Sequence, residues 1–229
     1  AVFGELIAWM VGVALILEYT LVVSAVAVGW SGYAAPLLQE YLNFPMTLAQ
    51  GPELGGIINL PAIFIIVVVG GLLIAGTRES ATLNAILVVI KLAALGLFLA
   101  VAFAVFNAAH FEPFMPLGFG KHTVTGADGN PIEVGVMAAA AIIFFAFYGF
   151  DAIATAAEEA KNPSRDLAIG IVGSMAVCVL IYMAVAAAAI GAVAYTQFAD
   201  SREPLALILR QIGQGWAAKI LAVSAVVAL

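Results

Sequence analysis

The chain has 229 residues, of which 65% are hydrophobic and only 10% are charged, and its formal net charge is −6. A water-soluble domain of this length needs more polar residues than this to cover its surface. We therefore expect most of the chain to be surrounded by lipid. A bilayer core of about 30 Å needs about 20 apolar residues per helix, and the sequence supplies that length several times. The composition therefore predicts a multi-pass, all-α membrane protein. No basic run indicates a nucleic acid partner.

The ends of the chain and its single cysteine add two expectations. The sequence begins at Ala1 without an initiator Met or a signal-peptide pattern and ends at Leu229 inside an apolar run, so we expect an internal piece of a longer protein. Cys178 lies alone in an apolar stretch, which excludes an internal disulfide and a cysteine-based metal site. We interpret it as a core residue and expect no metal and no cofactor.

Apolar runs predict six spans within one transmembrane domain. In chain order they cover residues 5–33, 55–76, 81–106, 134–160, 163–194 and 215–229. The first is longer than a bilayer requires, which indicates tilt, and the last is too short to cross alone. Asn162 followed by Pro163 is a favourable N-cap and first-position pair for the fifth span.

The connections between spans predict the orientation. Arg78 lies in one short connection, and Lys161 and Arg165 lie in another. Because short cytoplasmic loops carry the excess of Lys and Arg, these connections are predicted to be cytoplasmic. The longer connections would then lie on the opposite side. The turn-forming run 126–131 predicts that the connection between the third and fourth spans is exposed, and residues 195–214 are predicted to form a further polar connection.

Three ionisable residues fall deep inside predicted spans, where a charge is expensive and is usually paired or placed for function. Glu18 and Lys91 lie near the middle of the first and third spans, and Asp151 lies within the fourth. The alternative is that they form structural hydrogen bonds or ion pairs between helices.

The run 144–151 is the most informative stretch of the sequence. Aromatic side chains alternate with small residues around Gly149 in the middle of a span, and Asp151 follows directly. A helix that breaks at this depth exposes backbone groups that can bind a polar solute. We therefore predict that residues 145–149 interrupt the helix; the alternative is an aromatic packing face with a tolerated glycine.

These runs resemble those of a known superfamily. Residues 144–151, 157–166 and 169–171 resemble the sixth helix and the following loop of the amino acid-polyamine-organocation transporters, closest to the cationic amino acid transporter group and its bacterial homologues. Residues 15–20 and 29–33 are similar to that group's third helix, and residues 77–81 and 90–91 to its fourth-to-fifth hairpin and fifth helix. The resemblance covers essentially the whole chain, and its motifs occur in the family's order.

The resemblance implies a fold and a function. It implies a leucine-transporter-like inverted-repeat fold, with this chain covering roughly helices three to eight. The expected activity is secondary active transport of amino acids by alternating access, across the plasma membrane or the bacterial inner membrane. The amino acid would be held between broken helices one and six. Because helix one is absent from this chain, the polypeptide alone is not expected to transport.

The resemblance also implies the roles of single residues. The substrate-binding segment would comprise Phe145, Ala146, Phe147, Tyr148 and Gly149, with backbone carbonyls receiving the substrate amino group and an aromatic ring over the site. The ion-coupling residues would be Lys91, Glu18 and Asp151. Lys91 matches a lysine that replaces a sodium ion of related carriers, which indicates proton coupling. Glu18 and Asp151 are predicted to face each other, one of them holding a proton because two nearby like charges repel.

Other functions remain open at this point. Exchange of amino acids or polyamines fits the same fold, and a passive channel or a non-transporting receptor is a further alternative. Residues 29–32 fit the G-x-S-G pattern of intramembrane serine hydrolases, with Ser31 as the nucleophile. The only histidines, His110 and His122, fall in a loop rather than on a neighbouring helix, so we expect no catalytic residue and no enzyme.

Overall fold

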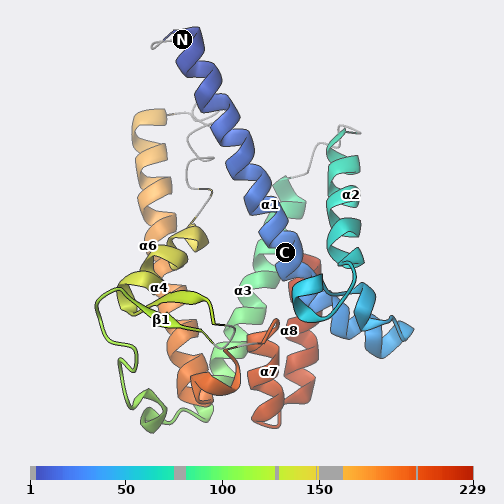
Figure 1. Ribbon diagram of the computed structural model, residues 1–229, viewed down its shortest axis with the longest axis vertical. Coiled ribbons are helices and arrows are strands. Elements are labelled where there is room, and N and C mark those ends of the chain that lie inside the picture. Colours follow the sequence, from blue (N-terminus) through green and yellow to red (C-terminus); the bar gives the residue numbers. More distant parts are fainter. Residues whose placement is uncertain are drawn as a thin grey trace. The chain divides into compact units, whose positions relative to one another are not determined.

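The computed structural model describes residues 4–74, 81–126, 129–147, 149, 162–199 and 201–228, and most of them are helical (Figure 1). The chain divides into two compact units. The first comprises Ala1–Val101 with Thr196–Leu229, and the second comprises Ala102–Tyr195.

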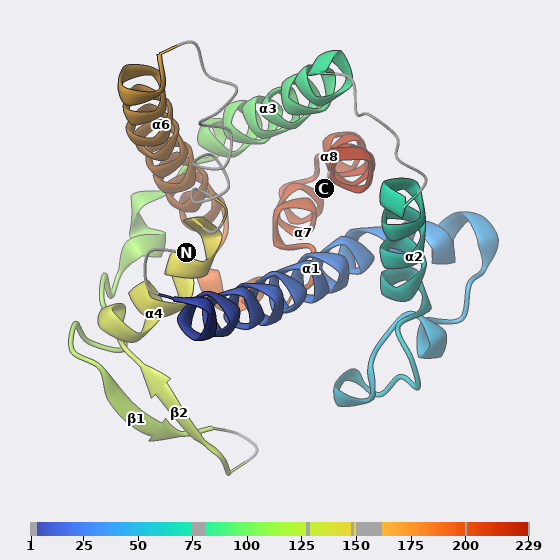
Figure 2. The same cartoon turned by 90° about the horizontal axis from the view of Figure 1, so that it is seen from above.

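The first unit consists mainly of helices and combines both ends of the chain. Its helices are α1 (Glu5–Leu42), α2 (Leu60–Ile74), α3 (Ala81–Ala104, which ends just beyond the unit), α7 (Pro204–Gln211) and α8 (Gly215–Ala228). Short 3-10 turns accompany them at Met46–Leu48 and Pro52–Leu54, and a further one, Tyr195–Gln197, begins at the last residue of the second unit. Helix α8 packs against both α1 and α7, and α2 packs against α1 (Figure 2).

Helix α1 is longer than the predicted span. It continues past residue 33 and through Pro36 to Leu42. Asn43 then adopts the left-handed conformation, its N–H donates to the carbonyl of Gln39 at 3.1 Å, and the N–H of Phe44 donates to that of Leu38 at 3.3 Å. The stretch between the first two predicted spans is therefore helical as far as Leu42. A proline inside a long apolar helix removes one backbone hydrogen bond, which a membrane helix tolerates.

The connection predicted over residues 195–214 holds a helix that the sequence reading missed. Helix α7 buries Ala206, Ile208 and Leu209, and a charged pair joins Glu203, just before its first residue, to Arg210 in its last turn. The chain just before α7 also packs closely on α1. A Cβ added at Gly32 would lie 2.9 Å from the carbonyl oxygen of Arg202, so glycine is required there.

The second unit combines a hairpin, a short helix and a long one. Its elements are η3 (Ala108–Phe111), β1 (His122–Thr125), β2 (Pro131–Val134), α4 (Val136–Ile143), η4 (Phe144–Phe147) and α6 (Pro163–Ala192). The predicted exposure of the long connection is confirmed, since both strands are exposed over nearly their whole length. The antiparallel pairing of β1 with β2 was not predicted.

Asn162 is the N-cap residue of α6, as predicted. The hydrogen bond described there runs opposite to the usual one, because the backbone N–H of Asn162 donates to the carboxylate of Asp166 at 3.2 Å. A carboxylate in the first turn also offsets the partial positive charge of the helix N-terminus.

The C-terminal end of α6 is fastened to the chain that follows α3. The carbonyl of Gly191 accepts a hydrogen bond from the backbone N–H of Asn107 at 2.8 Å, and the His110 ring nitrogen Nδ1 lies 3.1 Å from the same oxygen. The ring of Phe106 lies against Gly191, between the rings of Phe103 and Phe111 at centroid distances of 5.8 Å each. We call this cluster the Gly191 clamp.

Gly191→Ala is expected to lower the melting temperature of the purified full-length parent. An added Cβ would overlap the hemmed-in Phe106 ring, and such overpacking costs about 1–3 kcal/mol. The matched control is Gly173→Ala, because a Cβ there meets nothing within 4 Å and alanine favours a helix by about 0.5–1 kcal/mol. Equal melting temperatures for both variants would contradict the clamp.

The large apolar side chains lie mainly on the outside of the described chain. Trp9, Leu17 and Leu73 are 64–67% exposed, whereas the buried residues are mostly alanines. Within the described ranges, three helical stretches are long and apolar enough to cross a membrane, at Glu5–Leu42, Ala85–Ala104 and Arg165–Ala192, and two shorter apolar helices accompany them. Such a surface needs lipid or further helices around it, which confirms the all-α membrane class.

Candidate functional site

The α-helix of the predicted fourth span ends at the expected place. Helix α4 ends at Ile143, residues 144–147 form a 3-10 turn, and Gly149 has φ +101°, in the region that favours glycine. The predicted interruption over residues 145–149 is therefore confirmed for the backbone that the structure describes. We call residues 144–149 the broken segment. Tyr148 and the side chain of Phe145 lie outside the description.

Tyr182 on α6 contacts the broken segment. Its hydroxyl donates to the carbonyl of Ala146 at 3.2 Å, and its ring meets the ring of Phe147 edge-on at a centroid distance of 5.4 Å. Sequence reasoning missed this residue. The only available signal was a polar-tipped aromatic residue inside an apolar span, and aromatic residues with a polar tip usually find a hydrogen-bond partner when they pack.

Tyr182→Phe is expected to weaken substrate binding about threefold to tenfold in the full-length parent, because one hydrogen bond contributes about 0.5–1.5 kcal/mol. The ring contact with Phe147 would remain, so the variant removes only the bond to the Ala146 carbonyl. Binding of labelled amino acid to the purified protein measures the effect. Tyr195→Phe, at an exposed tyrosine, serves as the control. Unchanged affinity in Tyr182→Phe would show that the hydrogen bond to the Ala146 carbonyl does not contribute to substrate binding.

Lys91 lines a cavity of about 200 Å³ in the first unit. Its walls come from α1, α3, α7 and α8, and the polar side chains among them are Tyr33, Lys91 and Ser224. The apolar lining residues are Ala94, Leu95, Leu205, Leu221 and Ala225. The ion pairs found among the described residues do not include Lys91. We call this space the Lys91 cavity.

The predicted pairing of Glu18 with Asp151 stays a prediction. Glu18 lies on α1 and is exposed. The nearby hydroxyls on the same helix bond back to its backbone: Thr20 donates to the carbonyl of Ile16 at 2.7 Å, and Ser24 to that of Thr20 at 2.8 Å. Asp151 lies outside the described residues.

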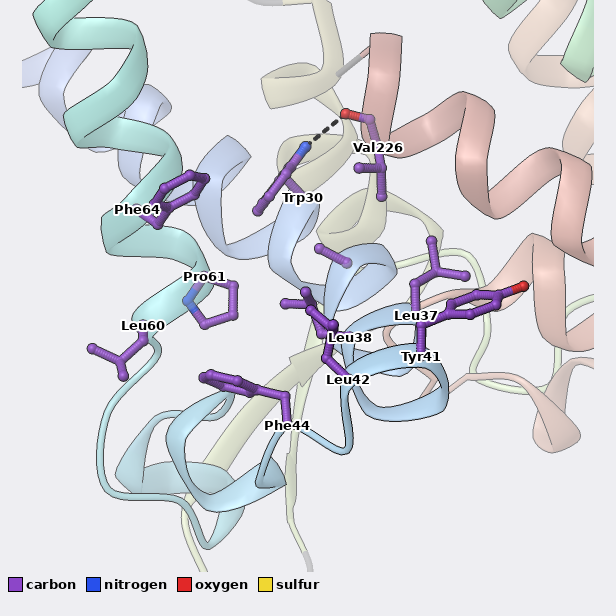
Figure 3. Close-up of a pocket in the computed structure, with 11 residues that line it drawn as sticks. Trp30, Leu37, Leu38, Tyr41, Leu42, Phe44, Leu60, Pro61, Phe64 and Val226 are labelled. Atoms are coloured by element: carbon purple, nitrogen blue, oxygen red, sulfur yellow. Dashed lines mark hydrogen bonds between the residues drawn. The ribbon is translucent and has the colours of Figure 1, made fainter.

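A second and larger cavity has a different character. It measures about 540 Å³ and opens between the C-terminal part of α1, the start of α2 and the end of α8 (Figure 3). Leucines, Phe44, Pro61 and Phe64 dominate its walls, and the indole N–H of Trp30 is occupied by the carbonyl of Val226 at 2.9 Å. With so few polar groups it cannot pair the charged ends of an amino acid. It is therefore not our candidate substrate site.

The hydrolase alternative finds no support in the surroundings of Ser31. The Ser31 hydroxyl is buried, accepts a bond from the Asn59 side-chain amide and donates to the carbonyl of Val28, each at 2.7 Å. The ring nitrogens Nδ1 of His110 and His122 each lie 3.1 Å from a backbone carbonyl. Ser31 therefore acts as a packing link between α1 and the segment that begins α2.

The long apolar helices define the class, a helical membrane protein. The amino acid permease family model matches residues 1–229, so the chain belongs to the amino acid permease family. The resemblance to the amino acid-polyamine-organocation superfamily is thereby confirmed, and the chain is transporter sequence rather than enzyme sequence.

Several characterised proteins are similar to the chain. It is 42% identical to the branched-chain amino acid permease BcaP of Bacillus subtilis (strain 168), over all of this chain and 47% of the relative. It is 35% identical to the methylthioribose transporter of the same organism, over 99% of this chain and 46% of the relative. It is 30% identical to the chloroplastic cationic amino acid transporter 9 of Arabidopsis thaliana, over 99% of this chain and 38% of the relative. The chain thus spans less than half the length of these relatives.

Proposed function

We propose that the protein containing this chain is a secondary active carrier of amino acids that works by alternating access in the cell membrane and is driven by protons. The observation that carries the proposal is the broken segment. The end of an α-helix leaves its last carbonyls without intrahelical partners, and a charged amino group offers three donors to such acceptors. The Ala146 carbonyl and its neighbours, ordered by Tyr182, would receive the substrate amino group.

The carboxylate of the substrate would bind outside this chain. The resemblance assigns it to a glycine-rich broken helix one, so the described residues account for one end of the amino acid. The relatives are named for different substrates: branched-chain amino acids, methylthioribose and cationic amino acids. Their names therefore do not indicate which substrate side chain this protein prefers. The proposal is therefore limited to an α-amino acid.

Lys91 is the residue that would bind and release the coupling proton. A lysine deep in a helix, lining a small cavity with a tyrosine and a serine, can lose and regain a proton as that cavity opens to either side. The ammonium form donates three hydrogen bonds, whereas the neutral amine donates two, so the two forms would favour different access states. Glu18 and Asp151 remain the other proposed coupling residues.

The test is uptake by the full-length parent in proteoliposomes. Labelled leucine, arginine and methylthioribose are offered with and without an inward proton gradient. We expect the gradient to concentrate at least one of the two amino acids above its external level. Uptake that occurs only into vesicles preloaded with amino acid would instead identify an obligatory exchanger. Flux that does not saturate with concentration would identify a channel.

A further inference from the structure

The larger cavity, between α1, α2 and α8 of the first unit, has no part in the proposed transport mechanism. It measures about 540 Å³, within the range of about 300–1,000 Å³ in which proteins hold single small molecules. On α1 its lining residues follow one another at helical spacing and therefore form one continuous face: Trp30, Ala34, Leu37 and Tyr41. We call this space the Trp30 groove.

One end of the Trp30 groove is apolar and lies at Trp30 and Val226. The indole N–H of Trp30 already donates to the carbonyl of Val226 at 2.9 Å, so it has no hydrogen left for a ligand (Figure 3). The wall from α2 consists of Leu60, Pro61 and Phe64. A polar group placed against such side chains would be left unpaired at a high cost. A ligand in this part of the groove must therefore be a hydrocarbon.

The other end of the groove is bordered by a charged pair. Glu40 is the direct neighbour of the lining residue Tyr41, and its carboxylate accepts a hydrogen bond from the ammonium of Lys219 on α8 at 2.5 Å. The two side chains are 48% and 58% exposed, so both can be reached from outside the protein. This bond uses one of three ammonium hydrogens and one of two carboxylate oxygens. The pair can therefore bind a further group that carries both a negative and a positive charge.

The separation of the two ends matches one leaflet of a bilayer. Trp30 and Glu40 are separated by about 15 Å along α1, and Val226 and Lys219 by about 10 Å along α8. Half of a bilayer core of about 30 Å is about 15 Å. Because Lys219 lies in the second turn of α8, the charged pair is near the end of a membrane helix, where lipid head groups are found. The groove thus has the length and the polarity of an amphiphile that occupies one leaflet.

We propose that the Trp30 groove binds one phospholipid of the bilayer, whose acyl chain fills the groove and whose head group carries a phosphate and a primary amine, as in phosphatidylethanolamine. The phosphate accepts hydrogen bonds from the Lys219 ammonium, and the amine donates to the Glu40 carboxylate. A choline head group has no N–H for Glu40, and a glycerol head group has no positive charge. The predicted orientation assigns this lipid to the outer leaflet.

The bound lipid would stabilise the first unit, because it contacts three helices at once. Two of them, α1 and α8, also carry lining residues of the Lys91 cavity, Tyr33 and Ser224. A ligand that binds only the folded protein raises its stability in proportion to the logarithm of its concentration. Phosphatidylethanolamine is therefore expected to raise the melting temperature of the purified full-length parent more than phosphatidylcholine does.

The test measures lipid binding to the delipidated full-length parent by native mass spectrometry. The protein is titrated with phosphatidylethanolamine, phosphatidylcholine or phosphatidylglycerol, and we expect the first to bind about tenfold more tightly than the other two. Glu40→Gln and Lys219→Gln should each reduce this preference to about twofold or less. Ala34→Phe places a ring inside the groove and should abolish the preferred binding. The control is Glu133→Gln, whose exposed carboxylate pairs with Lys121 in the hairpin at 2.7 Å.

Each other outcome would overturn the proposal. Equal affinity of the parent for the three lipids would exclude recognition of the head group. An unchanged preference in Glu40→Gln and Lys219→Gln would assign the lipid to another site. Failure of all three lipids to bind would show that other helices of the parent cover the groove. If Ala34→Phe does not fold, the two exposed variants decide the question. Because binding is measured without transport, this result is independent of the proposed function.

Discussion

Lys91→Ala in the full-length parent is expected to abolish the accumulation of substrate in response to a pH gradient while substrate binding persists. Among the described residues, Lys91 provides the one ammonium group in the lining of its cavity, and alanine removes this group without placing a new charge there. Substrate binding should stay within a few-fold because the broken segment, which we propose as the binding site, belongs to the other unit of the chain. Uptake into proteoliposomes with an imposed gradient, beside equilibrium binding of labelled amino acid, measures both properties.

The control for this variant is Lys121→Ala, which removes an exposed lysine of the hairpin whose partner is Glu133. It should transport as the parent does, since an exposed ion pair contributes about 0–1 kcal/mol. A Lys91→Ala protein that still concentrates substrate would show that Lys91 is not the coupling residue. Glu18 and Asp151 would then be the next residues to change.

Gly149→Ala is expected to weaken substrate binding about tenfold or more. Gly149 has φ +101°, and a residue with a Cβ pays about 1–3 kcal/mol to hold such a conformation. The added Cβ would meet nothing within 4 Å, so the effect would come from the backbone and not from crowding. The broken segment would then move away from the conformation that presents its carbonyls to the substrate.

Gly170→Ala is the matched control for that variant, because this glycine lies in the helix α6 without a positive φ and also has open space around it. It should bind as the parent does and melt slightly higher, by about 0.5–1 kcal/mol in unfolding free energy. Calorimetric binding and thermal melting are measured on both proteins. If both variants bind the amino acid with equal affinity, the positive φ of Gly149 is not needed for substrate binding.

The elements that were predicted correctly are those with a strong one-dimensional signal. Lipid requires long apolar helices with all backbone groups bonded, so composition and run length indicated helices at positions near those of α1, α2, α3, α6 and α8. The break before Gly149 was also predictable, because glycine among aromatic residues at mid-span is locally unfavourable to a helix.

The elements that were missed depend on tertiary contacts. Pro36 remains helical because the rest of α1 compensates for one missing bond, and the short helix α7 gains its stability from packing and not from its length. Tyr182 belongs to the candidate site only through a partner distant in the chain. A single hydroxyl gives no periodic signal, so no pattern in the sequence could have predicted this contact. The approach of Glu18 to Asp151 stays a prediction.

The Gly191 clamp has a consequence for how this part of the sequence can vary. The clamp holds Asn107 next to Gly191, so the two ends of the polypeptide between them lie close together. Closely spaced ends are also typical of domains that are inserted into another protein. Residues added to or removed from the hairpin would therefore leave the path of the chain on either side unchanged. This arrangement makes the hairpin of β1 and β2 a suitable position for an epitope tag or a fluorescent reporter.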